Sequence, residues 1–170
     1  YDLFMKLLNE AVLEEKGEPV KKIPECLIDF NINAYIPEDY IKSSNQRIDA
    51  YKKTALIECE EDMRDVYDEL TDRYGKMPEY TENLLKVSLL RILGGKCGFS
   101  KKKKKGRDIN FYPTQFVFAD MSRFVALTEG RATIKMGSSA YVSYKSTLGP
   151  KSLKDCIDLL NNYLSFTKKS

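Results

Sequence analysis

The chain has 170 residues, of which 42% are hydrophobic and 31% charged, with a formal net charge of +3, so the composition predicts one compact globular domain. It contains no apolar run of the roughly 18 residues that a transmembrane helix needs and no signal-peptide pattern, and we expect a cytoplasmic protein without a membrane partner. It also contains no histidine, which excludes a catalytic triad, a histidine general base and a His-containing zinc site.

The first half is predicted to be mainly helical. Tyr1–Lys16 has an apolar face and is followed by Gly17, which predicts an amphipathic helix, and the chain begins inside it as a fragment of a longer polypeptide would. Leu27–Ile32 alternates apolar and polar residues with the period of a half-buried strand. Helices are then expected over 44–57, with Ile48 and Tyr51 inward, over 62–74, and over 80–96, the most apolar of the three.

The second half is predicted to alternate strands and helices. Strands are expected over 99–103, 108–112, 133–136 and 141–144, and helices over 114–127 and 152–167. The order is therefore β-β-α-β-β-α, and the chain as a whole is predicted to have a mixed α/β (α+β) fold. We divide it into a leading helix, residues 1–16, and a domain, residues 17–170, with a helical part over 17–98 and a mixed part over 99–170.

The helix predicted from Asp62 to a glycine cap at Gly75 has two different faces. At 100° per residue its apolar residues form one stripe, while Asp65, Asp68, Glu69 and Asp72 lie on the other side. Residues 58–72 contain eight carboxylates and a single basic residue, Arg64, and neighbouring like charges on a helix each cost roughly 0.2–0.5 kcal/mol.

Three interpretations of this acidic face remain open. It is a solvated helix surface, a docking surface for a basic partner, or a divalent-metal site using Asp68, Glu69 and Asp72. The metal site is disfavoured, because acids spread along one exposed helix face rarely converge on one ion. No phosphate-binding loop is present, since Gly94-Gly95-Lys96 lacks the necessary upstream glycine. The four cysteines are scattered and are expected to be reduced thiols. We predict neither catalysis nor a bound cofactor in this chain.

Lys101–Lys105 is a run of five lysines. Such a run would attract phosphate without regard to base sequence, so a nucleic-acid-binding accessory module is the alternative function. A strand that alternates in and out cannot place all five on one surface, however, and edge strands use lysine to resist aggregation. A solvated hairpin tip is therefore the favoured interpretation of the run.

Several separate blocks give the chain a family resemblance. Over about residues 1–98 their order and spacing resemble the carboxy-terminal domain of bacterial transcription-repair coupling factor, and beyond Gly98 only the layout of strands and helices is similar. The matching residues are Tyr1-Asp2-Leu3-Phe4, Leu7-Leu8, Glu10-Ala11-Val12, Ile32-Asn33-Ala34-Tyr35-Ile36-Pro37-Glu38-Asp39-Tyr40-Ile41, Arg47, Tyr51-Lys52, Ala55, Asp68-Glu69-Leu70-Thr71-Asp72-Arg73-Tyr74-Gly75, Pro78 and Asn83-Leu84-Leu85.

The resemblance implies a multidomain, ATP-driven translocase on double-stranded DNA that removes stalled RNA polymerase and recruits excision-repair proteins. The motor, with its ATP and Mg²⁺, would lie upstream of this chain, and residues 1–16 resemble the helix that leads out of it. In the family the terminal domain packs against the amino-terminal repair-recruiting module, hides the surface that binds the damage-recognition protein, and restrains the motor.

The resemblance also implies roles for two residues of the acidic face. Glu69 and Asp72 occupy the positions expected to pair with arginines of the amino-terminal module, and Asp65 and Asp68 would reinforce the surface by helix geometry alone. Two residues depart from the family pattern: Cys59 stands at the N-cap, where a hydroxyl or Asp would cap better, and Tyr74 replaces a frequent phenylalanine.

Overall fold

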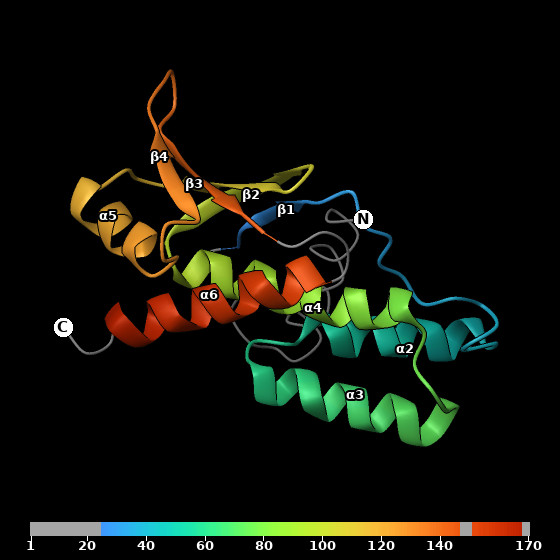
Figure 1. Ribbon diagram of the computed structural model, residues 1–170. Coiled ribbons are helices and arrows are strands. Elements are labelled where there is room, and N and C mark those ends of the chain that lie inside the picture. The colour runs from blue at the N-terminus through green and yellow to red at the C-terminus, as the bar shows by residue number, and fades with distance from the viewer. Residues whose placement is uncertain (1–24, 147–150, 168–170) are drawn as a thin grey trace. The chain divides into compact units, whose positions relative to one another are not determined.

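The computed structural model describes residues 25–146 and 151–167 (Figure 1). The elements within them follow one another in the order β1, α2, α3, α4, β2, β3, α5, β4, β5 and α6. Their bounds are β1 Leu27–Asp29, α2 Ser44–Ala55, α3 Glu60–Tyr74, α4 Glu79–Lys96, β2 Phe99–Lys105, β3 Asp108–Pro113, α5 Phe118–Ala126, β4 Ala132–Lys135, β5 Tyr141–Lys145 and α6 Lys151–Thr167.

The mixed α/β class is confirmed, as are the helical first half and the β-β-α-β-β-α order of the second. The helix expected over 114–127 begins later, at Phe118, and the early strand ends at Asp29 rather than at Ile32. The helix predicted over residues 1–16 lies outside the described residues. The chain divides into two compact units, of which the first comprises Ile32–Leu89 among the described residues and the second comprises 25–31, 90–146 and 151–167.

The first unit contains α2, α3 and the beginning of α4. Its core is mainly aliphatic, and both the helices and the segments between them contribute to it. The buried residues include Ile36, Ile41, Ala50, Ile57, Leu70, Met77, Leu84 and Leu85. The segment before α2 is fixed to α4 by polar contacts. Tyr35 N–H donates to the Tyr80 carbonyl at 3.2 Å, and the Thr81 hydroxyl donates back to the Tyr35 carbonyl at 3.1 Å.

Tyr40 holds the end of α3. Its hydroxyl lies within hydrogen-bond distance of the carbonyls of Leu70, at 3.2 Å, and Gly75, at 3.1 Å. The last carbonyls of a helix lack intrahelical donors, so this hydroxyl satisfies part of the C-terminus. Gly75 follows at φ +86°, where only glycine is unstrained, and its N–H donates to Thr71. The helix therefore ends at the predicted glycine.

Two apolar side chains of the first unit are more exposed than their spacing predicts. Ile48, expected inward on α2, is 45% exposed, and Ala50 and Thr54 are the buried residues of that helix. On α3 only Leu70 of the predicted stripe is fully buried, and Tyr67 is 39% exposed. On both helices, fewer apolar side chains are buried than the apolar spacing alone predicts.

The second unit is built on a five-stranded sheet with the strand order β1-β2-β3-β5-β4. β1 pairs with β2 in parallel, through the partners Leu27–Lys101 and Asp29–Lys103. The remaining pairs, β2–β3, β3–β5 and β4–β5, are antiparallel. β2 is therefore an internal strand, and the expectation that its lysines protect a sheet edge is wrong.

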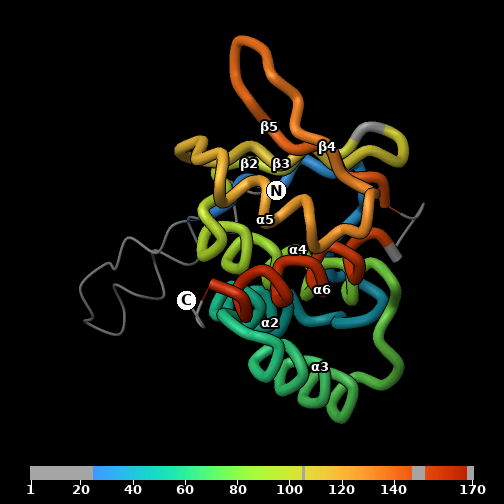
Figure 2. The backbone as a smooth tube through the Cα atoms, turned by 60° about the vertical axis from the view of Figure 1, so that its left-hand side comes forward, coloured from blue at the N-terminus to red at the C-terminus, as the bar shows by residue number. Residues whose placement is uncertain are grey.

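One face of the sheet packs on helices. Aromatic rings meet there at centroid distances of 5.0 to 5.3 Å, joining Phe99, Phe111, Phe124 and Tyr163 from β2, β3, α5 and α6. Figures 1 and 2 both place α6 and the second half of α4 on this side of the sheet. Aromatic contacts of this kind stabilise a core beyond their buried area.

Lys102 lies on the packed face of β2 and is completely buried. Its ammonium nitrogen donates to the Leu90 carbonyl of α4 at 3.2 Å. Desolvation lowers the pKa of Lys102, and the neighbouring thiols of Cys26, Cys156 and Cys97 raise it by a smaller amount. Burial likewise raises the pKa of the Cys97 and Cys156 thiols to about 12. The solvated hairpin tip predicted for all five lysines is wrong at this position.

Gly94 gives Lys102 and Cys26 the room they occupy against α4. A Cβ at Gly94 would lie 2.6 Å from Cys26 Cβ and 2.9 Å from Lys102 Nζ. We therefore expect Gly94→Ala to destabilise the protein by about 1–3 kcal/mol, although alanine is the better helix former. Urea unfolding measures this. Gly137→Ala is the control, because nothing lies within 4 Å of its Cβ, and equal effects of the two substitutions would contradict the prediction.

Lys102→Met should stabilise the protein, by about 1–2 kcal/mol at neutral pH, because it removes a group whose charged form is penalised by burial. At pH values between the lowered pKa of Lys102 in the folded protein and its ordinary value of 10.5, the unfolded parent binds more protons than the folded parent. The parent's stability therefore rises with pH across that interval, and the advantage of methionine should shrink. Urea unfolding of both proteins from neutral pH to about pH 10 tests this.

The control for that experiment is Lys103→Met, on the exposed face of the same strand. It should change the free energy of unfolding by less than about 0.5 kcal/mol. A methionine advantage at position 102 that stayed constant or grew with pH would contradict the assignment of a desolvated amine. The thiols of Cys97 and Cys156 reduce the stability of both proteins above their ordinary pKa of 9.0, so the difference between the two curves is the quantity to compare.

Candidate interdomain docking surface

α3 begins without a side-chain N-cap, and an acidic residue of its first turn makes the hydrogen bond to the preceding backbone instead. Cys59 is the N-cap residue, as predicted, and its side chain makes no capping hydrogen bond. Asp62, in the first turn, accepts a hydrogen bond from the Glu58 N–H at 3.0 Å. Glu60, Glu61 and Asp62 also place negative charge at the positive end of the helix dipole. The sequence therefore compensates at the first turn for its poor N-cap.

The four candidate residues of α3 divide into two kinds. Asp65, Asp68 and Asp72 are exposed, and within the part of the chain that the structure describes they have no ion-pair partner. At 100° per residue these three span an arc of only about 60°. Glu69 lies at the edge of the arc and forms an ion pair with Lys53 of α2. The first three carboxylates are thus available on one face, and the fourth is engaged.

The Lys53–Glu69 pair contributes little to stability. The two side chains are 37% and 42% exposed, so water screens their attraction. Exposed pairs of this kind contribute about 0–1 kcal/mol. The pair nevertheless changes the local charge, because it places the Lys53 cation beside the acidic residues of α3.

A hollow of about 260 Å³ lies along the same side of α3, between α3 and the end of α2. Leu56, Ile57 and Val66 give it an apolar lining, and Asp62, Asp65 and Lys53 stand among them. An incoming side chain would therefore meet apolar surface beside the Asp65 carboxylate. This arrangement suits a long cation such as arginine, whose stem packs on apolar surface while its guanidinium binds carboxylate.

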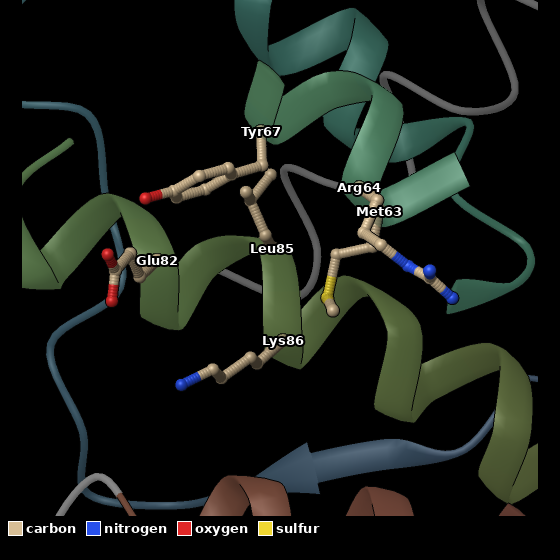
Figure 3. Close-up of a pocket in the computed structure, with 6 residues that line it drawn as sticks. All are labelled: Met63, Arg64, Tyr67, Glu82, Leu85 and Lys86. Atoms are coloured by element: carbon tan, nitrogen blue, oxygen red, sulfur yellow. The ribbon is translucent and has the colours of Figure 1, made fainter. Parts of the chain in front are cut away.

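A second hollow, of about 230 Å³, lies between α3 and α4 (Figure 3). Met63 points from α3 toward α4, and Leu85 points from α4 toward α3. The charged ends of Arg64 and Lys86 point away from each other in this view. Tyr67 lines this hollow, which explains why its ring is not fully buried although it lies on the apolar stripe.

The five-lysine run does not form one surface. Lys102 is buried against α4, and the ammonium nitrogen of Lys104 lies 3.0 Å from the Ser152 hydroxyl of α6. Lys101 and Lys103 lie on the opposite face of β2, where Lys103 is exposed. Alternation along the strand, predicted from sequence, therefore separates the run into two sets.

Neither a membrane span nor a metal cluster occurs in the described ranges, 25–146 and 151–167. No helix there is both long and apolar enough to cross a membrane. The same residues include no group of three or more His, Cys, Asp or Glu side chains arranged to hold a metal ion.

Comparison with known proteins agrees with the family resemblance found in the sequence. The family described as the TRCF domain matches residues 30–123. A transcription-repair-coupling factor of Staphylococcus haemolyticus is 36% identical over 111 residues, which is 64% of this chain. The corresponding factor of Staphylococcus aureus USA300 is 33% identical over 114 residues, or 66% of this chain. Both alignments cover 10% of the relative, so this chain spans about a tenth of their length.

A solved structure has the same fold. It is a crystal structure of the C-terminal domain of transcription-repair coupling factor, with a TM-score of 0.75 and 19% sequence identity. The alignment covers 89% of this chain and 98% of that one. The family match, which includes the whole of α3, spans more than half of the chain. This chain therefore belongs to the TRCF-domain family and corresponds to the C-terminal domain of a transcription-repair coupling factor.

Proposed function

We propose that this chain is a non-catalytic regulatory domain, and that Asp65, Asp68, Glu69 and Asp72 of α3 dock it on a basic surface of the amino-terminal repair-recruiting module of the same protein. The observation that supports this most directly is the narrow arc of α3 in which three carboxylates are exposed and have no ion-pair partner among the described residues. Like charges so placed destabilise a free helix, and a basic partner relieves that cost.

The apolar hollow beside α3 supports the same proposal. Ion pairs at a surface contribute little unless an apolar contact excludes water around them. Leu56, Ile57 and Val66 provide such a contact next to Asp65. The docking contact then combines a small apolar centre with several charge pairs, and its total strength is a few kcal/mol. A contact of that strength holds the domain in place and still allows its release.

Docking of this domain would act on the whole protein. In the docked state the domain masks the surface that recruits the damage-recognition protein of excision repair, and it restrains the upstream ATP-driven motor on double-stranded DNA. Engagement of a stalled RNA polymerase releases it. ATP and Mg²⁺ belong to the motor in this scheme, and the present domain contributes the inhibitory contact.

Charge reversal on α3 tests the proposal in the full-length protein. Asp68→Lys with Asp72→Arg, or Glu69→Lys alone, should raise the basal ATPase rate and the binding of the damage-recognition protein. The double reversal should weaken docking at least tenfold, by an order-of-magnitude estimate, since it converts two attractive pairs into repulsive ones. Steady-state ATPase assays and a pull-down with the damage-recognition protein measure the two effects.

The matched control is Asp158→Lys, which reverses an exposed carboxylate on α6. It should leave both readouts at the parental level. The circular dichroism and melting temperature of the 170-residue chain should be close to parental in every variant, because the altered side chains are at the surface. If the α3 variants remained as inhibited as the parent, this face would not be the docking surface.

The Lys53–Glu69 pair leads to a second prediction. Lys53 competes with a partner arginine for Glu69, so Lys53→Met should strengthen binding of the separately produced amino-terminal module by about two- to fivefold. Titration calorimetry at low salt measures this. Lys42→Met removes the same charge from an exposed loop position outside α3. Equal gains from the two substitutions would show that net charge alone is responsible and that the pair plays no part.

A further inference from the structure

One row of side chains crosses the outer face of the five-stranded sheet. β1 and β2 pair Leu27 with Lys101, and β2 and β3 pair Lys101 with Tyr112. β4 and β5 pair Lys135 with Tyr141. Phe111 pairs with Val142, so the next residues along, Tyr112 and Tyr141, face each other across β3 and β5. Two tyrosines thus stand at the middle of the sheet with a lysine on either side.

This face is open in the second unit. The helices that pack on the sheet contact its other face. Phe124 of α5 contacts Phe99, the Leu90 carbonyl of α4 accepts from Lys102, and Ser152 of α6 contacts the Lys104 ammonium. Figures 1 and 2 place no described helix of this unit on the outer face. Lys135 is exposed, and Lys101, Tyr112 and Tyr141 are partly exposed.

The two tyrosine rings are already ordered relative to each other. Their centroids are 5.0 Å apart with an interplanar angle of 30°. The ammonium nitrogen of Lys101 lies 5.9 Å from the Tyr112 centroid, within the range of a cation–π contact. Lys101 thus flanks Tyr112 on the β2 side, and the side of Tyr141 turned away from Tyr112 is directed toward β4 and Lys135.

The adjacent row is polar. It contains Lys103, Asn110, Ser143 and Thr133, with Asp29 at the β1 end. Lys103 is exposed and lies beside Lys101 on the same face of β2. Amide and hydroxyl groups in the row next to an aromatic pair can hydrogen-bond the edges of a ligand whose flat face is stacked on the rings.

We propose that this sheet face binds single-stranded nucleic acid, with a base stacked at the Tyr112–Tyr141 pair and phosphates at Lys101, Lys103 and Lys135. A single strand fits because its bases have free faces for a tyrosine ring, whereas the bases of a duplex are stacked on each other. An acidic peptide would use the lysines but has no need of paired rings. The site is independent of α3, and it uses only alternate lysines of the run at 101–105.

Fluorescence anisotropy with the 170-residue chain and a labelled oligothymidylate of about 15 nucleotides tests the proposal. Binding should be detectable at low salt and should weaken as salt is raised. Tyr141→Thr, which preserves strand propensity, should weaken binding roughly tenfold, and Tyr141→Phe should retain it. Lys101→Ser with Lys135→Ser should reduce the slope of log affinity against log salt by about 0.7 for each lysine removed.

Two controls use residues away from this face. Tyr80 also forms a stacked pair, with Tyr35 at 5.0 Å and 16°, so Tyr80→Ala removes an equivalent ring from the first unit. Lys154→Ser removes an exposed lysine from α6. Neither should change oligonucleotide binding, and circular dichroism should show that every variant remains folded.

Three results would overturn the proposal. They are no binding of the oligothymidylate at low salt, binding that Tyr141→Thr does not weaken more than Tyr80→Ala does, and equal affinity for a duplex of the same length. An oligouridylate measured in parallel distinguishes an RNA site from a DNA site. Tighter binding of either single strand than of the duplex, with loss in the Tyr141→Thr variant, supports the assignment.

Discussion

The alternation of side chains along β2 constrains the whole second unit. β2 has a partner on each side, so a change of register by one residue would move every side chain of the strand to the other face. The register observed places Lys102 in the core and Lys103 in solvent. A buried amine then needs an acceptor and space, and the Leu90 carbonyl and the missing side chain of Gly94 provide them. The same register places Lys101 beside Tyr112 on the outer face. The core of this unit and its charged surface are consequences of one choice of register.

The motif residues of the first unit have mainly structural roles. Tyr40 closes the end of α3, the Tyr51 hydroxyl accepts the Ile36 N–H at 2.9 Å, and Arg47 donates to the Ile41 carbonyl at 2.8 Å. The contacts of Tyr51 and Arg47 satisfy backbone groups of the irregular segment before α2, and those of Tyr40 satisfy carbonyls at the end of α3. Among the acids of α3, Asp62 supports the helix start and Glu69 forms a weak pair. The exposed Asp65, Asp68 and Asp72 are not needed for the packing of the unit, which leaves them available for a partner.

Periodicity was sufficient to predict most elements but not their pairing. α4 and α6 follow from apolar spacing, and the end of α3 follows from Gly75, because these signals are local. The position of β2 inside the sheet depends on β1, a short strand far earlier in the chain, which no local pattern reveals. The pairing of Lys53 with Glu69 depends on how α2 packs on α3, and the tyrosine pair depends on register across β3 and β5. Burial of Lys102 was not predicted because a lysine run resembles a solvated segment, although strict alternation already required some of its members to face inward.

Weakness is a requirement for the proposed docking contact. An inhibitory contact that must be released cannot rest on deeply buried ion pairs, because breaking one leaves an uncompensated buried charge and costs several kcal/mol. Asp65, Asp68 and Asp72 are exposed, and the pair at Glu69 is more than one-third exposed, so each contributes little alone. Lys53 lowers the net gain further, because a partner must displace it before using Glu69. The strength of docking is then set by how many weak contacts form together around the hollow beside α3, and loss of a few of them is enough to release the domain.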